Sequence, residues 1–386
     1  MPTITPHRLV ATLLVIATLA LLLPCPIAAE SAEGAANPPK EDVWEGVINA
    51  IVEEHDTEAL GQPQHYQVLE LTLTSGVQSG RVITVEHVAY ALTDLQRYHE
   101  GQRVMVVRAQ EPSGREAFYV SGPVRRGPLA WMFLLFVAAV IATGRKRGAL
   151  ALLGMALSFV VIALLILPRI AAGDDPVTVA VIGSALTVPI TFYLSHGVNR
   201  KTTVAVIGTA ISLVITGVLA RLFVEGAYLT GYASEEAGFL QVTGIGAIDV
   251  KGLLLAGIIV GVLGVLDDVT VSQAAIVQQL KAANPIAPFR QLFGGAMAVG
   301  RDHIASMVNT LVLVYAGAAM PLLLLLTDSS QPFWQLINYE IIAEEIVRML
   351  VASLGLIVAV PITTFLASLA MIDASAASGD TAPYHG

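Results

Sequence analysis

Cysteine and charge are both scarce in this sequence of 386 residues. The single cysteine, Cys25, excludes an intrachain disulfide and a metal cluster built on cysteine ligands. Charged residues make up 13% of the chain, against 55% hydrophobic residues and a mean hydropathy of +0.71. Because an ordinary soluble domain has about 25% charged residues, this composition excludes a water-soluble protein with one apolar core. It predicts a polytopic membrane protein that is surrounded by the lipid bilayer.

The sequence also lacks the short motifs of several enzyme classes. It contains no HExxH, no GxSxG and no Walker loop, so a zinc protease, a hydrolase and an ATPase lack their essential residues. The net charge of −9 and the absence of a basic stripe argue against nucleic-acid binding, which depends on clustered Lys and Arg. No spacing of Asp and His is diagnostic of a metal site. We therefore expect no enzyme, no catalytic residue, no cofactor and no resident metal.

The first 127 residues divide into an export segment and a β-rich domain. Residues 1–29 contain a long uncharged stretch after Arg8, which is typical of either a signal peptide or a first transmembrane span. Residues 30–127 contain alternating or β-branched runs that are separated by turn residues such as Ser75-Gly76. The pattern predicts an extracytoplasmic domain shaped as a small barrel of the OB type. Its five expected strands are residues 43–52, 66–73, 81–88, 103–109 and 117–120.

Seven apolar segments follow in residues 128–371, and a short tail, residues 372–386, ends the chain. Basic residues at 145–147, 200–201, 281, 290 and 301 all fall in loops of one parity, and such loops are usually cytoplasmic. The predicted fold class is thus mainly α, a polytopic helical membrane bundle preceded by a small β-barrel-like extracytoplasmic domain, with the tail in the cytoplasm. The expected spans are residues 128–143, 149–171, 177–197, 202–224, 252–271, 304–326 and 346–371.

Two adjacent carboxylates, Asp267 and Asp268, end the apolar run that begins at Gly252. This run is shorter than the about 20 residues that a helix needs to cross the hydrocarbon core, so we expect both carboxylates in the membrane or at its rim. An ionised Asp at the centre of a membrane helix costs about 2.5–3.5 kcal/mol. Each carboxylate therefore needs a partner, a proton, an ion or water.

Helical spacing separates the two carboxylates. Asp268 shares one face with three glycines, and a face of small residues predicts close packing against a neighbouring helix. Asp267 is turned about 100° away from Asp268, so it lies on a different face. The predicted helix-packing residues are Gly257, Gly261 and Gly264.

The next span begins with a second polar group. We expect an ion pair between Asp268 and Arg301, because both lie near the same end of neighbouring spans and an unpaired buried charge is costly. Around this pair the sequence predicts a wet cavity for an ion, a proton or a small solute. The alternative is that these residues only mark helix ends in the headgroup region. The candidate residues of the pathway are Asp267, Asp268, Arg301, Asp302, His303 and Asn309.

Three segments, residues 264–274, 300–313 and 315–322, resemble the YibE/F family of bacterial multi-pass membrane proteins. They read GVLDDVTVSQA, GRDHIASMVNTLVL and YAGAAMPL, and the resemblance extends over about residues 44–371. It implies an extracytoplasmic amino-terminal domain, a set of membrane spans and a location in the plasma membrane.

Together these patterns predict a transporter-like or channel-like protein for an ion or a small solute, with a polar site near the cytoplasmic side. The alternative is a membrane scaffold or binding protein whose extracytoplasmic domain recruits a protein partner. The sequence leaves the substrate, the direction of transport and the oligomeric state open.

Overall fold

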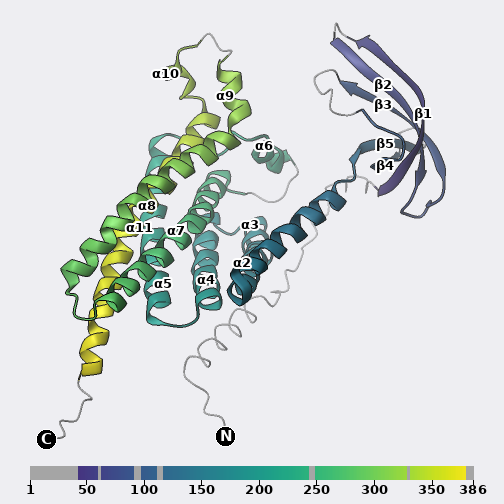
Figure 1. Cartoon of the computed structure of the whole chain (residues 1–386). Helices are drawn as coiled ribbons and strands as arrows, with labels where there is room; N and C mark the ends of the chain where they lie inside the picture. Colours follow the sequence, from purple (N-terminus) through teal and green to yellow (C-terminus); the bar gives the residue numbers. More distant parts are fainter. Residues whose placement is uncertain are drawn as a thin grey trace, which may run out of the picture. The chain divides into compact units, whose positions relative to one another are not determined.

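The computed structural model describes residues 42–59, 62–90, 97–110, 116–242, 248–327 and 331–379 (Figure 1). The described chain divides into two compact units, one up to Ala139 and the other from Val140 onward. The expected signal peptide or first span, residues 1–29, and residues 380–386 of the expected tail lie outside the described residues.

The first unit contains a five-stranded antiparallel sheet. Its order is β3-β2-β1-β4-β5, and every neighbouring pair is antiparallel. Each strand coincides with a run expected from the sequence, so the prediction of five strands is confirmed, although β1 continues well past residue 52. The strands are β1 (Asp42–Ala59), β2 (Gln62–Leu73), β3 (Val82–Tyr90), β4 (Arg103–Gln110) and β5 (Glu116–Pro123).

Alternation along the strands builds the core of the sheet. Leu69, Leu71 and Leu73 alternate on β2 and are buried on one face. The indole ring of Trp44 occupies the space that a side chain at Gly76 would need. Because Gly76 also has a φ of +84°, the turn after β2 requires glycine at this position. The core is completed by Ile48, Ile83, Val85, Tyr98, Val104 and Val106.

The sheet curls into a half-barrel. Register shifts interrupt β1 between Ile48 and Ala50 and again after Ile51, and such bulges increase the twist of a strand. Arg81, directly before β3, lies with its Nη1 atom 3.4 Å from Oε2 of Glu116 at the start of β5. The two edge strands thus approach each other, but no backbone ladder joins β3 to β5 among the described strands. The barrel-like shape is confirmed as a curled, open sheet.

The described chain from Arg126 onward is helical. A π-helical turn, η1, precedes Pro168, whose missing N–H disturbs the regular ladder. Side-chain caps begin two helices: Asp175 accepts a hydrogen bond from the Thr178 amide in α4, and Asn199 accepts one from the Thr202 amide in α5. The elements are α2 (Arg126–Val161), η1 (Ile162–Ile166), α3 (Leu167–Ala171), α4 (Pro176–His196), α5 (Arg200–Gly226), α6 (Glu235–Val242), α7 (Val250–Ala283), α8 (Phe289–Ala318), α9 (Met320–Thr327), α10 (Phe333–Leu336) and α11 (Glu340–Gly379).

Five helices of the described chain are long and apolar enough to cross a membrane, or six if α8 and α9 form one span with a bend of 69°. The first of these, Arg126–Ala171, has 46 residues. If straight it would measure about 70 Å, more than twice the hydrocarbon core of about 30 Å. Its backbone leaves the helical conformation at Arg145 (φ 49°, ψ −129°), within the basic loop expected between the first two spans. Seven separate spans stay a prediction.

The centre of the second unit is formed by α5, α7 and α11, which pack against one another (Figure 1). α7 buries a long face there that includes Ile258, Val262 and Leu266. α4 packs on α7, and α8 packs mainly on α11. The predicted fold class, mainly α with a small β-rich domain before it, is confirmed.

Candidate functional site

Asp267 and Asp268 lie in the middle of α7, which continues to Ala283 instead of ending at the pair. Asp268 is exposed. Asp267 is partly buried, and its Oδ1 atom is buried without a hydrogen-bond partner among the described residues. Because a buried carboxylate oxygen without a donor is unfavourable, Asp267 is the unusual member of the pair.

No described residue packs against the glycine face of α7. Gly257, Gly261 and Gly264 are exposed together with Asp268, and a Cβ atom added to any of the three would meet nothing within 4 Å. Among the described residues no helix packs on this face, so a packing role for the three glycines stays a prediction. α7 packs through the face that contains Thr270. The sequence did not reveal this, because apolar residues occupy both sides of the helix and the glycine spacing does not show which side is covered.

The polar residues of the following span lie along α8. Arg301, Asp302 and Asn309 are exposed, whereas His303 is partly buried with an Nε2 atom that has no partner among the described residues. No ion pair joins Asp268 to Arg301 in the described chain, so this expectation is wrong. Both side chains are exposed on the outside of the described helices.

α8 instead approaches α7 and α11 through Gly300. A Cβ atom at Gly300 would lie 2.7 Å from Cγ1 of Val360 and 3.0 Å from Nε2 of Gln273, so glycine permits this contact. Gln273 is fully buried, and its Oε1 atom accepts a hydrogen bond from the Thr364 hydroxyl at 3.0 Å. Its Nε2 atom has no partner among the described residues, which leaves an amide donor free within the interface.

A hydroxyl pair joins α5 to α7 close to Asp267. The Oγ1 atoms of Thr209 and Thr270 are 2.7 Å apart, and neither residue has exposed surface. Thr270 follows Asp267 by three residues, and its Oγ1 atom also lies 3.4 Å from the Asp267 carbonyl oxygen. Residues three apart are neighbours on a helix surface, so the buried carboxylate oxygen and the hydroxyl pair lie on adjoining parts of α7.

We call the residues Thr209, Asp267, Thr270, Gln273 and Thr364 the polar layer. Further buried hydroxyls continue it along the same helices, and several have no hydrogen-bond partner among the described residues. Neutral oxygen atoms beside one carboxylate can accept a proton or coordinate a hard cation. The described residues contain no group of three or more His, Cys, Asp or Glu side chains that could hold a metal ion. The unpartnered hydroxyls belong to Thr202, Ser212, Thr363 and Ser368.

A second carboxylate without a partner for one oxygen lies at the other end of α11. Glu344 is buried, and its Oε1 atom has no hydrogen-bond partner among the described residues. One turn earlier, Glu340 accepts hydrogen bonds from the Thr230 hydroxyl at 2.8 Å and the Gly231 amide at 2.9 Å, which ties α11 to the loop after α5. Glu340 is thus a structural acceptor, whereas Glu344 accepts a hydrogen bond from the Ala233 backbone and keeps its Oε1 atom without a partner among the described residues.

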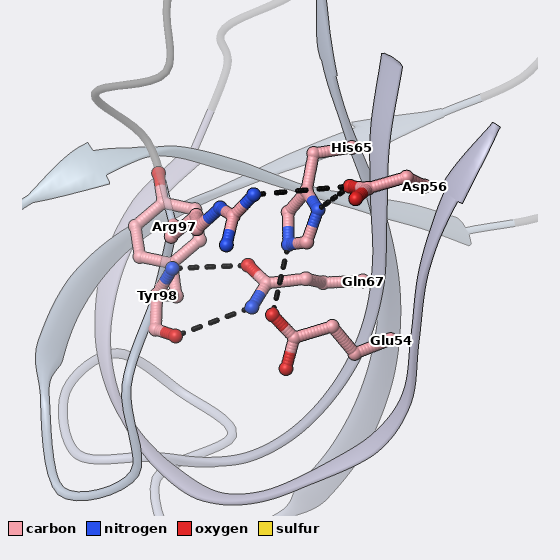
Figure 2. Close-up of polar contacts among 6 residues, drawn as sticks. All are labelled: Glu54, Asp56, His65, Gln67, Arg97 and Tyr98. Carbon is pink, nitrogen blue, oxygen red and sulfur yellow. Dashed lines mark hydrogen bonds and ion pairs between the residues drawn. The ribbon is translucent and has the colours of Figure 1, made fainter. Parts of the chain in front are cut away.

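The sheet unit has its own charged cluster, which Figure 2 shows. The ring of His65 lies between two carboxylates, with Nδ1 2.6 Å from Asp56 Oδ1 and Nε2 2.9 Å from Glu54 Oε1. Arg97 reaches the same oxygen of Asp56 at 3.8 Å. The hydrogen bond from His65 is the largest cause that lowers the pKa of Asp56 below its usual value.

Beside this cluster, Gln67 holds the backbone of Tyr98 with both ends of its amide (Figure 2). Its Oε1 atom accepts from the Tyr98 amide at 2.9 Å, and its Nε2 atom donates to the Tyr98 carbonyl at 3.2 Å. Gln67 is fully buried, and this pairing attaches the segment before β4 to the inner face of β2.

The comparisons with known proteins assign the helical part of the chain to a family. Residues 132–373 match the model of the family described as YibE/F-like protein, which is more than half of the chain. The chain belongs to the YibE/F-like family. No curated protein and no solved structure matches it. The match includes all three segments that carry the resemblance, as well as every residue of the polar layer, but it leaves out the sheet unit. In this YibE/F-like protein the family is thus shown for the multi-pass membrane region alone.

Sequence patterns single out Asp267 but not the groups around it. Thr209, Thr270 and Thr364 are not charged, and hydroxyl residues are common in membrane helices, where they often bond to the carbonyl one turn earlier. A glycine on one helix that faces a threonine on its neighbour would have indicated where the helices pack. Gly208 is an example, because a Cβ atom there would lie 2.5 Å from the Thr363 hydroxyl.

Proposed function

We propose that this protein moves a proton or a small cation across the membrane, and that Asp267 is the residue that binds it. The observation that carries the proposal is the buried Oδ1 atom of Asp267, which has no partner among the described residues and belongs to a residue three positions before Thr270 of the Thr209–Thr270 hydroxyl pair. The proposal assigns the protein no enzymatic reaction.

The cost of burying charge supports a bound cation or proton. An ionised Asp within a membrane helix costs about 2.5–3.5 kcal/mol, and pairing or neutralisation reduces that cost. The described residues offer Asp267 no ion pair. A proton on the carboxylate, or a cation shared with neutral oxygens, would neutralise it. Asp302 and Arg301 are exposed on α8 and are not needed for this role.

The polar layer contains neutral side chains in the packed centre of the helical unit. Thr209, Thr270 and Gln273 are fully buried, and carbonyl, hydroxyl and carboxylate oxygens are the ligands that hard cations prefer. Free hydroxyls farther along α5 and α11 would give a proton or ion successive polar contacts through an otherwise apolar interface. This arrangement favours a transporter or channel over a scaffold.

The proposed orientation follows from the basic loops. Lys146 and Lys201 with their neighbouring arginines favour the cytoplasmic side, which puts the sheet unit outside and the tail inside. On this assignment the polar layer lies in the cytoplasmic half of α7, and Glu344 lies toward the outer side. The protein is then a plasma-membrane component.

A flux assay tests the proposal with a matched pair of variants. The full chain in proteoliposomes is compared with Asp267→Asn and Asp268→Asn, while proton and alkali-cation movement are recorded with dyes and tracers. We expect Asp267→Asn to abolish the flux and Asp268→Asn to preserve it. Equal flux in the wild type and in Asp267→Asn would rule out this assignment of the site.

A second candidate is a scaffold whose sheet unit recruits a protein partner. The observation in its favour is the charged cluster of Glu54, Asp56, His65 and Arg97, because Glu54 and Asp56 are exposed. This candidate predicts that replacing Glu54 and Asp56 by neutral residues removes a crosslinked partner in cells, whereas Asp267→Asn leaves it in place. The transporter proposal predicts the opposite for flux: Asp267→Asn abolishes it, whereas replacing Glu54 and Asp56 by neutral residues leaves it in place.

A further inference from the structure

A cavity of about 570 Å³ opens between α4, α5 and α7, at the end of the bundle where α4 and α7 begin and α5 ends. Its volume is within the range of about 300–1,000 Å³ that is typical of small-molecule sites. None of its lining residues belongs to the polar layer. The apolar walls are formed by Val181, Leu213, Val214, Val218, Leu255 and Ile259.

The cavity opens sideways between the helices. Val181, Val214 and Val218 line it and are nevertheless 41%, 63% and 54% exposed. In a bundle that spans a membrane, side chains exposed on the flank of α4 and α5 face the lipid. Since the hydrocarbon region holds no water to fill such an opening, an apolar chain is its natural occupant.

Five charged side chains line the cavity, and three of them, Asp175, Arg221 and Glu225, already have partners within the protein. Nε of Arg221 lies 2.9 Å from Oε1 of Glu225, which makes an ion pair within α5. Asp175 accepts a hydrogen bond from the Thr178 amide at 2.8 Å and thereby caps α4. These residues stabilise helix ends and leave no net positive charge for an anion.

The two remaining charges at the mouth are Lys251 and Asp249. Both line the cavity, and neither has an ion pair or a hydrogen bond from its side chain to another described residue. They have opposite signs and are two residues apart, directly before and within the first turn of α7. A ligand that carries one anionic and one cationic group would satisfy both.

We infer that this cavity binds a phospholipid whose headgroup carries both a phosphate and a primary ammonium. One acyl chain lies between α4, α5 and α7, the phosphate contacts Lys251, and the ammonium contacts Asp249. A purely anionic headgroup is disfavoured, because it would leave Asp249 unpaired and would approach the carboxylates of Asp175 and Glu225. This site is separate from the proposed ion pathway, so either can fail without the other.

Native mass spectrometry of the purified full chain tests the inference, with phosphatidylethanolamine and phosphatidylglycerol of identical acyl chains as probes. Gly217 lines the cavity, and a Cβ atom there meets only Cδ1 of Ile259 at 4.0 Å, so Gly217→Leu would fill the space. Gly226→Leu on the same helix is the control, because Gly226 does not line the cavity and a Cβ atom there meets nothing within 4 Å. Val214→Trp is a second filling variant at an exposed position, should Gly217→Leu fail to fold.

We expect the wild type and Gly226→Leu to retain one phosphatidylethanolamine, and the filling variants to bind it about tenfold more weakly, a loss of about 1.4 kcal/mol. Lys251→Ala and Asp249→Asn should keep a bound lipid but lose the preference for phosphatidylethanolamine over phosphatidylglycerol. Equal retention by the wild type and both filling variants would overturn the site. Absence of any headgroup preference in the wild type would overturn the roles of Lys251 and Asp249.

Discussion

Asp267 and Asp268 are neighbours in the sequence, yet their side chains lie in different surroundings on α7. Asp268 is exposed, while the Oδ1 atom of Asp267 is buried without a hydrogen-bond partner among the described residues. The difference follows from the rotation of about 100° between consecutive residues of a helix, which turns one carboxylate toward the packed side and the other toward the open glycine face. The two residues have the same chemistry and almost the same depth along the helix. They therefore form an internal control for every effect attributed to burial.

The first prediction concerns stability. Asp267→Asn should keep or raise the free energy of unfolding, by up to about 1–2 kcal/mol, because it replaces a carboxylate that is costly in its ionised form by a neutral side chain of the same shape. Asp268→Asn is the comparison at almost the same depth, on the exposed face of the helix, and we expect a smaller change from it. Thermal unfolding of the full chain in detergent measures both. A stability loss in Asp267→Asn would mean that the carboxylate has a stabilising partner.

The second prediction concerns the hydroxyl pair of Thr209 and Thr270. Valine has nearly the same shape as threonine, so Thr209→Val and Thr270→Val each remove one hydroxyl of the pair; Thr270 then keeps only its longer contact of 3.4 Å to the Asp267 carbonyl. We expect each single variant to be destabilised by about 1 kcal/mol and the double variant by less than the sum. The coupling should be about 0.6 kcal/mol, the average for such pairs in a membrane protein.

Thr310→Val is the matched control for this cycle. Thr310 lies on α8, is exposed, and donates its hydroxyl to the Ser306 carbonyl one turn earlier. Its loss should cost less than about 0.5 kcal/mol. Additive effects of Thr209→Val and Thr270→Val would show that the hydroxyl contact does not link α5 to α7.

The strands of the sheet unit could be predicted because their signals are local. Alternation places Leu69, Leu71 and Leu73 on one face, and Gly76 marks the turn that follows. The length of β1 could not be predicted in the same way, because its continuation to Ala59 depends on pairing with β2 across the hairpin.

The candidate site could be predicted only in part. The charge of Asp267 is visible in the sequence, but the partners of α7 are not, since both faces of the helix are apolar and hydropathy does not distinguish them. Glycines on one face indicated packing there, whereas burial is centred on the face of Thr270 and Gln273. An ion pair of Asp268 with Arg301 failed for the same reason, because charge and depth alone do not specify the direction of a side chain.

The third prediction separates glycines that are packed from glycines that are open. A Cβ atom at Gly300 would lie 2.7 Å from Cγ1 of Val360, so Gly300→Ala should destabilise the protein by about 1–3 kcal/mol through overpacking. At Gly261 a Cβ atom meets nothing within 4 Å, and Gly261→Ala should be neutral or stabilising by about 0.5–1 kcal/mol, because alanine is the better helix former. Thermal unfolding of both variants is the measurement. A destabilised Gly261→Ala would show that the open face is covered in the protein as it exists in detergent, for instance by a second copy.

The fourth prediction is a loss of stability of the sheet unit in two steps as the pH falls. Burial lowers the pKa of His87 from its usual value of 6.5, and nearby His65 lowers it further, so the folded state keeps His87 neutral while the unfolded chain takes up a proton. Its contribution to stability is therefore present above about pH 6.5 and is lost as the pH falls below that value. The pKa of Asp56 is also lowered, chiefly by the hydrogen bond from His65, so its contribution is present above about pH 4 and is lost below it.

Hydrogen exchange of the full chain, corrected for the intrinsic effect of pH, measures these steps in peptides from β3 and β4. His87→Gln should remove the upper step and leave the lower one, because the exchange protection then no longer depends on a buried imidazole. His99→Gln should retain both, since His99 is exposed. Asp56→Asn should remove the lower step alone. If protection stays constant from pH 7 to pH 5 in the wild type, the buried ring of His87 does not limit the stability of the sheet, and if His99→Gln abolishes the upper step, the proton is taken up elsewhere.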